Sequence, residues 1–202
     1  PFATAIELLH NFSLIHDDIE DNSDLRHERL AVWKVWGLAQ GINTGDAMLC
    51  LARTMALGLT ASGHSAETTL AALALLDRTC LTLCHGQFLD IAFEKQRAVS
   101  LAQYEQMAAA KTAALLSASC KGGGLLAGAD SVACEALAAM GRELGLAYQI
   151  IDDLLGIWGD SAVTGKPTAT DITMRKKTYP IVYALQWEKD HGLNDLEGLY
   201  AT

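Results

Sequence analysis

The sequence predicts an all-α protein that folds as a single domain over residues 1–202. Three observations support this fold class. Alanine and leucine are abundant, and apolar residues recur at helical spacing along most of the chain. Runs that alternate apolar with polar residues, which would indicate strands, are scarce. The chain contains only three prolines, and with 202 residues, 50% of them hydrophobic, it is long enough to bury one core.

The boundaries of the helices follow from apolar stripes and from turn-forming residues. An apolar stripe that starts at residue 5 runs straight into the acidic residues from 17 onward, and polar residues 20–29 are expected to form a loop. Ser65 is expected to cap its helix. Three consecutive glycines at 122–124 predict a break or kink, and the Gly-, Pro- and Thr-rich segment 159–170 predicts a loop. Further helices are expected over residues 43–60, 65–96, 100–118, 130–157 and 176–189.

Charge and composition exclude several classes of protein. The net charge is −9 and no basic stretch is present, so we expect no nucleic-acid partner. Clustered carboxylates can nevertheless bind an anionic substrate through divalent cations. No apolar run reaches the length of a transmembrane helix, so we expect no transmembrane segment. The five cysteines are odd in number and form no C-x-x-C pair, which predicts reduced thiols and a cytoplasmic location.

The first cluster of chemically significant residues lies at the end of the first apolar stripe. Asp17 and Asp21 are four residues apart, so their carboxylates project from one helical face, and Asp18 lies beside them. Like charges packed this closely call for a compensating cation, and Mg²⁺ prefers such oxygen ligands. Arg26 and Arg29 follow and could bind the same anion. The alternative is an ordinary solvated helix end, because D-D-x-x-D arises easily by chance.

A second cluster repeats this arrangement later in the chain. An apolar helix brings Asp152 and Asp153 to its C-terminal region, where carboxylates oppose the helix dipole unless a cation compensates. Gln149 lies on the same face. Lys166 and Lys176 follow, and they suit a metal–diphosphate assembly in which ammonium groups bind the remaining phosphate oxygens. For each lysine alone, ordinary surface charge is the alternative interpretation.

Together these residues resemble the polyprenyl synthetase family. The first aspartate-rich motif of the family, D-D-x-x-D, matches Asp17 to Asp21, and the later pattern aromatic-Gln-x-x-Asp-Asp matches Tyr148 to Asp153. The motifs occur in the family's order and at similar spacing over nearly all of the chain. Matches between them are Gly45-Asp46, the Gly-Gln-x-x-Asp pattern at Gly86 to Asp90, and the lysine–threonine pair Lys111-Thr112.

The resemblance implies a fold, a reaction and a set of site residues. The fold would be an isoprenoid synthase-type helical bundle around a central cavity. The reaction would be the Mg²⁺-dependent, head-to-tail condensation of isopentenyl diphosphate with an allylic diphosphate. The implied metal ligands are Asp17, Asp18, Asp21, Asp152 and Asp153. The implied catalytic residues are Asp17, Asp18, Lys111, Gln149 and Asp152. The implied substrate-binding residues are Phe12, Arg26, His27, Lys111, Thr112, Gln149, Lys166 and Lys176.

The resemblance also sets expectations about the product and the assembly. A bulky residue at the position of Phe12, five residues before Asp17, looks like a floor that limits product length, which favours a C15 to C20 product. The alternative is that Phe12 merely packs in the core, and the two roles do not exclude each other. Members of the family are commonly homodimers, so a homodimer is expected here.

Some features depart from the family pattern and keep other functions open. The upstream Gly-Lys-x-x-Arg segment has no counterpart, so we expect this chain to lack the N-terminal part of such an enzyme. His27 stands where a second arginine is usual. A catalytically impaired fragment or a non-catalytic partner subunit is therefore the alternative. A terpene cyclase, which shares D-D-x-x-D, is the least favoured reading, because the second motif, with Gln149, is that of the elongating enzymes.

Overall fold

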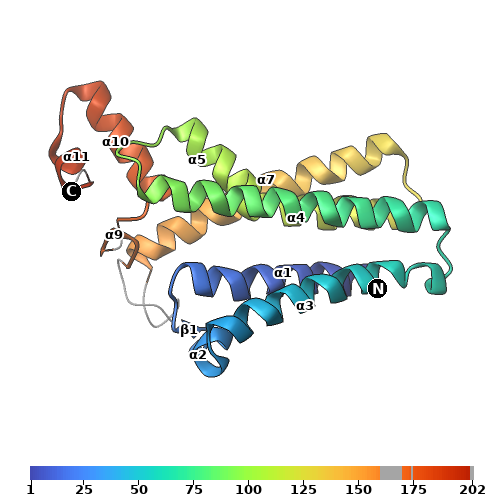
Figure 1. Ribbon diagram of the computed structural model, residues 1–202. Helices are drawn as coiled ribbons and strands as arrows, with labels where there is room; N and C mark the ends of the chain where they lie inside the picture. Colours follow the sequence, from blue (N-terminus) through green and yellow to red (C-terminus); the bar gives the residue numbers. More distant parts are fainter. Residues whose placement is uncertain (160–169, 174, 201–202) are drawn as a thin grey trace. The chain divides into compact units, whose positions relative to one another are not determined.

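The computed structural model describes residues 1–159, 170–173 and 175–200 of the chain (Figure 1). The predicted diphosphate contact Lys166 lies outside these described residues. Most of the described chain is helical, as predicted. None of the helices in the described part is both long and apolar enough to span a membrane. All five cysteines carry free thiols.

The chain forms two compact units. The first comprises Pro1–Leu81 and Leu115–Gly141, and the second comprises Thr82–Ala114 and Arg142–Thr202. Each unit therefore combines segments that are distant in the sequence. Two long helices, α4 (Ala66–Glu94) and α7 (Ser131–Trp158), contribute residues to both.

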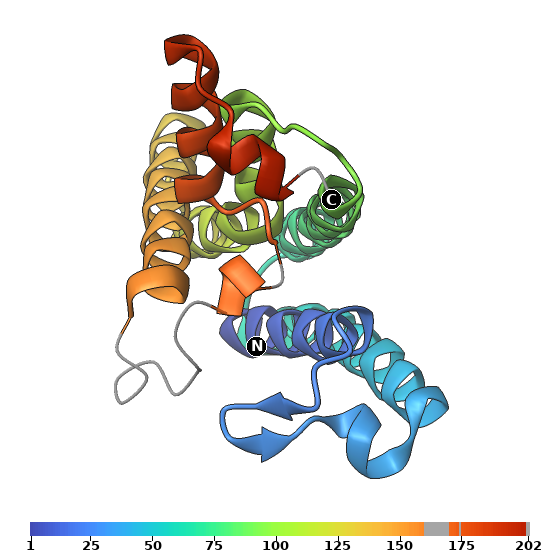
Figure 2. The same ribbon diagram turned by 90° about the vertical axis from the view of Figure 1, so that its left-hand side faces the viewer.

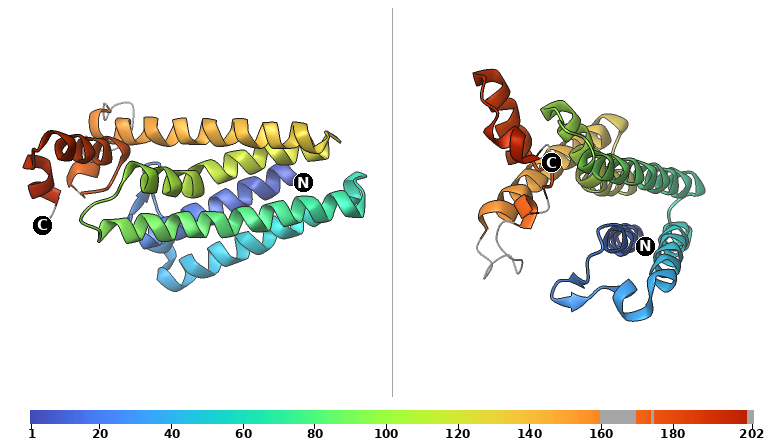
Figure 3. Two further views of the ribbon diagram at one scale, coloured as in Figure 1. Left: turned by 90° about the horizontal axis from the view of Figure 1, so that it is seen from above. Right: turned by 60° about the vertical axis from the view of Figure 1, so that its left-hand side comes forward.

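The first unit is built around helix α1, which packs along helix α3 (Figure 3). The close packing depends on Gly45 of α3, because a β-carbon there would lie 2.3 Å from Nε2 of His16 on α1. A second contact region buries Phe2, Leu59 and Ala72. The elements of this unit, besides the start of α4 and of α7, are α1 (Phe2–Glu20), α2 (Val32–Trp36), α3 (Leu38–Leu57), the 3₁₀ helix η1 (Thr60–Ser62) and α6 (Ala114–Leu126).

The three consecutive glycines do not break the helix, so the predicted break is wrong. Helix α6 continues through them to Leu126. A β-carbon on Gly122 would lie 2.1 Å from the ring of Phe2, and one on Gly124 would lie 2.6 Å from Leu137. Two of these glycines therefore let neighbouring side chains approach the helix axis. The contacts they permit compensate for the low helix propensity of glycine.

A short β-hairpin occupies part of the segment that was predicted to be a loop (Figure 2). Strands β1 (Leu25–Arg26) and β2 (Arg29–Leu30) pair antiparallel, with Arg26 opposite Arg29. The two turn residues, His27 and Glu28, have φ angles of 49° and 63°. Two-residue hairpin turns of this kind usually carry Asn-Gly, so the sequence His-Glu gave no hairpin signal.

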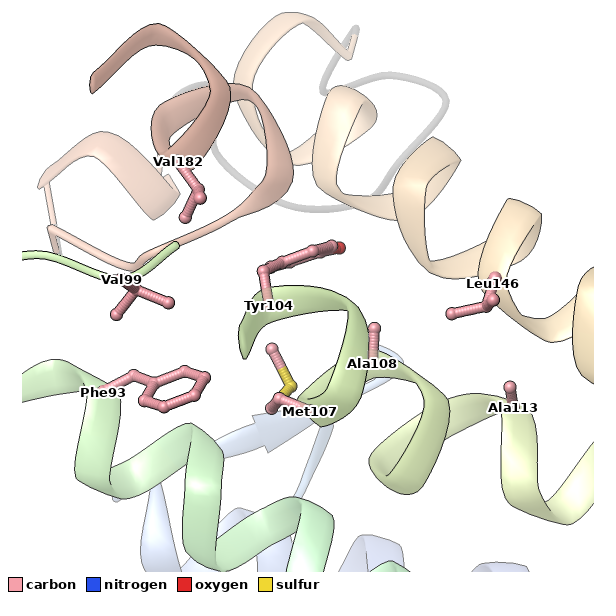
Figure 4. Close-up of a cluster of buried hydrophobic side chains, with 8 residues drawn as sticks. All are labelled: Phe93, Val99, Tyr104, Met107, Ala108, Ala113, Leu146 and Val182. Atoms are coloured by element: carbon pink, nitrogen blue, oxygen red, sulfur yellow. The ribbon is translucent and has the colours of Figure 1, made fainter. Parts of the chain in front are cut away.

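The second unit is organised around a core in which Tyr104 is only 1% exposed (Figure 4). Helices α4, α5, α7 and α10 contribute to this core, whose buried members are Phe93, Val99, Tyr104, Met107, Ala108, Ala113, Leu146 and Val182. The other elements of this unit are α5 (Leu101–Ala108), the π-helical turn η2 (Ala109–Ala113), α9 (Thr170–Thr173), α10 (Tyr179–His191) and α11 (Asp195–Tyr200).

Several helix boundaries test the turn signals in the sequence. Ser65 caps α4 as predicted, since its Oγ accepts the backbone N–H of Thr68 at 3.0 Å. The last predicted helix starts at Tyr179 instead of residue 176. Thr178 is extended there, with ψ of 163°, and Pro180 occupies the first turn, where proline is well tolerated.

Candidate functional site

The first acidic cluster lies at the C-terminal end of α1. Asp21 caps the helix, and its backbone N–H donates to the carbonyl oxygen of Asp17 at 2.9 Å. Asp18 is only 4% exposed, whereas Asp17 and Asp21 are half-buried. A buried carboxylate at the negative end of a helix dipole is unfavourable without a cation. The local structure therefore requires positive charge near Asp18.

Arg26 of the β-hairpin supplies that positive charge. Its Nη2 lies 2.7 Å from Oδ1 of Asp18 and 3.0 Å from Oδ2 of Asp17, and its Nε lies 2.9 Å from Oδ1 of Asp18. Burial alone would lower the pKa of Arg26, but the hydrogen bonds and charges of both aspartates raise it overall, so the guanidinium stays charged. The structure thus brings Arg26 beside the first acidic cluster. Its contact with a diphosphate stays a prediction.

The hairpin is held in position by contacts at its base. The backbone N–H of Ala31 donates to the carbonyl oxygen of Asp24 at 2.9 Å, and the indole N–H of Trp33 donates to the carbonyl oxygen of Ser23 at 2.8 Å. These two bonds join the two ends of the hairpin, and Arg26 within it reaches the carboxylates at the end of α1. His27 lies exposed in the turn, in the left-handed region that histidine tolerates better than most residues.

The donor chemistry of the first cluster fits a divalent cation. Over the described residues, no three His, Cys, Asp or Glu side chains are gathered as a group that could hold a metal. However, one nitrogen of Arg26 contacts carboxylate oxygens of both Asp17 and Asp18. These two oxygens can therefore share a single cation. Mg²⁺ commonly uses one or two protein carboxylates and completes its shell with water and substrate phosphate.

Phe12 lies on α1 before the acidic cluster. Its side chain is buried, and its ring packs edge-on against the ring of His16, with centroids 4.9 Å apart. This position agrees with the prediction that Phe12 packs in the core. The role of Phe12 as a floor for the product stays a prediction.

In the second unit, two glycines enclose the π-helical turn that carries Lys111 and Thr112. A β-carbon on Gly86 of α4 would lie 2.2 Å from the backbone nitrogen of Lys111, and one on Gly145 of α7 would lie 2.4 Å from Cα of Ala113. The backbone of η2 is therefore pressed between two helices. Because π-helical turns often occur at functional sites, this turn marks its two polar residues as candidates.

Lys111 forms an ion pair with Asp90. Its Nζ lies 2.5 Å from Oδ2 of Asp90, and both side chains are partly exposed. Asp90 follows Gly86 by four residues, so the two lie on one face of α4. Gly86 thus leaves room for the backbone of Lys111, and Asp90 binds the ammonium group of the same lysine.

A chain of hydrogen bonds connects Thr112 to the second acidic cluster. The hydroxyl of Thr112 donates to Oε1 of Gln149, and Nε2 of Gln149 donates to Oδ1 of Asp153 at 2.8 Å. Oδ2 of Asp153 accepts the hydroxyl of Tyr104 at 2.6 Å and the backbone N–H of Tyr179 at 2.7 Å. No role was predicted for Tyr104 from the sequence, because nothing in the spacing of α5 distinguishes it from an ordinary core tyrosine.

The two aspartates of the second cluster differ in environment. Asp153 is 5% exposed, and burial raises its pKa despite the hydrogen bonds from Tyr104, Tyr179 and Gln149 that oppose this rise. Asp152 is exposed. Since three donors already occupy the carboxylate of Asp153, the geometry favours Asp152 over Asp153 as a metal ligand.

The segment before α10 carries the predicted lysine. Lys176 is half-buried, and its backbone N–H donates to the carbonyl oxygen of Asp171 at 2.9 Å. Lys177 is buried, with its ammonium 4.8 Å from the centre of the Tyr200 ring. Burial, and to a lesser extent the charge of Arg175, lowers the pKa of Lys177. Of the adjacent pair Lys176 and Lys177, only Lys176 was predicted to contact a diphosphate, because adjacent lysines look alike in the sequence.

Gly156 stands one turn after Asp152, and the structure gives a reason for a glycine there. A β-carbon at this position would lie 2.1 Å from Oδ2 of Asp171. The carboxylate of Asp171 therefore occupies the space that a side chain on residue 156 would need. The carboxylate beside this turn of α7 is therefore that of Asp171, and residue 156 itself supplies none.

Comparison with known proteins places these features in a family. The Polyprenyl synthetase family pattern matches residues 1–201. The geranylgeranyl diphosphate synthase of Mycobacterium tuberculosis (strain ATCC 25618 / H37Rv) is 44% identical over 200 residues, which cover 99% of this chain and 56% of that protein. A (2E,6E)-farnesyl diphosphate synthase of the same strain is 46% identical over 192 residues, which cover 95% of this chain and 51% of that protein.

Solved structures that resemble this chain come from the same kind of protein. The crystal structure of a polyprenyl synthetase from Streptomyces coelicolor A3(2) matches 90% of this chain and 52% of its own, with a TM-score of 0.83 and 43% identity. The crystal structure of a geranylgeranyl pyrophosphate synthase matches 98% and 58%, with a TM-score of 0.89 and 35% identity. The chain thus spans about half the length of the relatives it matches.

Proposed function

The chain belongs to the polyprenyl synthetase family, and we propose that it is part of a short-chain isoprenyl diphosphate synthase, in which it binds and ionises an allylic diphosphate. The predicted isoprenoid-synthase fold is confirmed by the matching structures. Support for the function comes from a geranylgeranyl and a farnesyl diphosphate synthase that are 44% and 46% identical to this chain.

The proposed reaction joins isopentenyl diphosphate to the allylic substrate. The allylic C–O bond breaks and the diphosphate leaves with the electron pair. The double bond of isopentenyl diphosphate then forms a new C–C bond to the allylic carbon, and loss of a proton restores a double bond. Mg²⁺, when bound, neutralises the charge that develops on the leaving diphosphate.

One observation carries this proposal: a single guanidinium nitrogen lies between the carboxylates of Asp17 and Asp18 at the end of an apolar helix. The two oxygens lie close enough to share one cation, and Asp18 is buried, unlike a carboxylate at an ordinary solvated helix end. The proposed metal ligands are Asp17, Asp18, Asp21 and Asp152. The proposed diphosphate contacts are Arg26, Lys111, Thr112, Lys166 and Lys176, and His27 is a weaker candidate because it lies in the exposed hairpin turn.

Chain elongation assays test the proposal directly. The protein is incubated with labelled isopentenyl diphosphate, Mg²⁺ and allylic primers of five, ten or fifteen carbons. The assay is run on the 202-residue chain and on a version that includes the adjoining coding sequence. We expect an extended product of C15 to C20 in at least the longer version. If neither version extends any primer, the proposed function is wrong.

A non-catalytic partner subunit is the second candidate. It is favoured by the exposed His27, which stands where a second arginine is usual in the family. Mixing the chain with an active synthase of the family distinguishes the two. Co-purification with a shift in product length supports a partner role, whereas independent elongation by this chain excludes it.

Homodimer formation is a further part of the proposal. Helix α3 exposes several large apolar side chains, including Leu38, Ile42, Leu51 and Leu57, in the first unit. Apolar surface of this kind favours association. Sedimentation equilibrium over a range of concentrations tests this expectation, and a monomer at all concentrations would contradict it.

A further inference from the structure

A buried hydrogen-bond network joins three segments of the second unit at the carboxylate of Asp153. Tyr104 from α5 and the backbone N–H of Tyr179 from α10 both donate to Oδ2, and Gln149 from α7 donates to Oδ1. Each donor comes from a different helix, so the carboxylate links all three. The Tyr104 ring is only 1% exposed, so water has little access to its hydroxyl.

We propose that Tyr104 is a positioning residue that acts through Asp153, where it fixes the amide of Gln149 and holds the start of α10, three residues after Lys176. The catalytic part of this inference rests on the proposed function. The structural part concerns only the contacts of Asp153 and is independent of any activity.

The first step concerns the amide of Gln149. A carboxylate that already receives two donors at Oδ2 acts as an acceptor, so the group of Gln149 that faces it must be the N–H side. This fixes the oxygen Oε1 toward Thr112, whose hydroxyl donates to it. The orientation of the amide is thus set by Asp153, and Asp153 in turn is set by Tyr104.

The second step concerns the start of α10. Tyr179 is the first residue of this helix, and the first N–H groups of a helix have no partner within it. Asp153 therefore caps α10 from a different helix. The residues just before the capped N–H are Thr178, Lys177 and Lys176, so the cap limits how far the backbone of the two lysines can move.

The third step concerns the choice of Tyr104 over the other donors. The Tyr104 hydroxyl lies 2.6 Å from Oδ2 of Asp153, and it is the only one of the three donors that comes from α5. Removing that hydroxyl leaves a buried carboxylate with one donor fewer at Oδ2, while a phenylalanine ring still fills the core. Tyr104→Phe therefore tests the hydroxyl separately from the packing.

The decisive measurement is amide hydrogen exchange at Tyr179 in the 202-residue chain. We expect this amide to be protected in the wild type and to exchange about tenfold faster in Tyr104→Phe, because the carboxylate that accepts its N–H loses the Tyr104 hydroxyl that holds it in place. Tyr183→Phe is the matched control. It removes an exposed hydroxyl from the neighbouring turn of α10 and keeps the ring that stacks on Tyr179, so exchange should not change.

Kinetics of the active enzyme provide the second readout. We expect Tyr104→Phe to lower kcat about tenfold, with KM for isopentenyl diphosphate changed less than twofold. In an Asp153→Asn background the same substitution should have a much smaller effect, because the two residues act as one unit.

The outcomes separate this inference from the proposed function. An unchanged exchange rate of the Tyr179 amide in Tyr104→Phe overturns the inference. The inference is also overturned if the effects of Tyr104→Phe and Asp153→Asn on kcat multiply in the double variant, as they would for independent residues. A third outcome is that the Tyr179 amide exchanges faster in Tyr104→Phe while the wild type, with its adjoining sequence, extends no primer. This outcome supports the positioning role of Tyr104 in the structure and refutes only the proposed function.

Discussion

The backbone nitrogen of Lys111 lies 2.2 Å from the place where a β-carbon on Gly86 would be. The π-helical turn that carries Lys111 can approach α4 this closely only because residue 86 has no side chain. The same helix then supplies Asp90 to bind the ammonium group of Lys111. Close backbone packing and charge pairing therefore fix this lysine together.

The first prediction is that Gly86→Ala is strongly destabilising. The new methyl group would meet backbone, which cannot rotate away, so we expect a loss of about 2–4 kcal/mol in the free energy of unfolding. Urea denaturation measures it. Gly123→Ala is the matched control, because nothing lies within 4 Å of a β-carbon there and the residue is inside a helix. It should stabilise by about 0.5–1 kcal/mol. Equal effects of the two substitutions would refute the close-packing argument.

The second prediction concerns Arg26. Arg26→Gln leaves Asp17 and the buried Asp18 without their guanidinium, so we expect a loss of about 1–3 kcal/mol. If these carboxylates bind Mg²⁺, adding the ion should raise the melting temperature of the variant more than that of the wild type. Arg29→Gln, on the exposed opposite strand, serves as the control. An equal Mg²⁺ effect on Arg26→Gln and on the wild type would contradict this account of the site.

The third prediction concerns pH. Burial raises the pKa of Asp153 in the folded protein above its unfolded value, so in the window between the two values the folded state binds more protons than the unfolded state. Stability then falls as pH rises through that window. Asp153→Asn lacks this titration. Its stability relative to the wild type should therefore increase from about pH 4 toward neutral pH. Denaturation of both proteins across this range measures the difference, and a relative gain by the wild type at higher pH would show the opposite sign.

The fourth prediction concerns Thr112. Its hydroxyl orients toward Gln149 and is a proposed diphosphate contact. Thr112→Val keeps the shape of the side chain but removes the hydroxyl, so we expect kcat/KM for the allylic diphosphate to fall about 10- to 100-fold. Thr112→Ser keeps the hydroxyl and should stay within a few fold of the wild type. Steady-state kinetics decide, and a valine variant with wild-type kinetics would exclude Thr112 from the site.

The fifth prediction concerns product length. If Phe12 limits the growing chain, Phe12→Ala should produce longer prenyl diphosphates than the C15 to C20 products expected of the wild type. Because Phe12 is buried, the substitution should also cost about 3–5 kcal/mol of stability. Chromatography of the dephosphorylated products measures their length. Phe88→Ala, at an exposed position on α4, is the control. An unchanged product in a folded Phe12→Ala variant would leave Phe12 with a packing role only.

The sequence predicted much of the fold because helical stripes and caps are local signals. The acidic end of α1 and the cap at Ser65 both follow from residues within one or two helical turns. The glycines at 122 and 124 show where such reasoning fails. Their low helix propensity is a local property, whereas the contacts with Phe2 and Leu137 that compensate for it come from distant segments.

The site was predictable to the extent that its residues form motifs. Asp17, Asp18 and Arg26 are close in sequence, and the structure brings them together. The roles of Tyr104 and Asp153 were not predictable in the same way. Tyr104 lies 49 residues from Asp153, and no sequence pattern tells which of two adjacent aspartates is turned inward and bound by three donors.

The most direct test of the account is the rate of incorporation of labelled isopentenyl diphosphate as a function of Mg²⁺ concentration. The wild type, with its adjoining sequence, is compared with Asp17→Asn, Asp152→Asn and the exposed control Asp190→Asn. We predict that both site variants lose most of their activity and require more Mg²⁺, while the control behaves as the wild type. Wild-type rates and Mg²⁺ dependence in either site variant would contradict the claim that both aspartate clusters act in Mg²⁺-dependent ionisation.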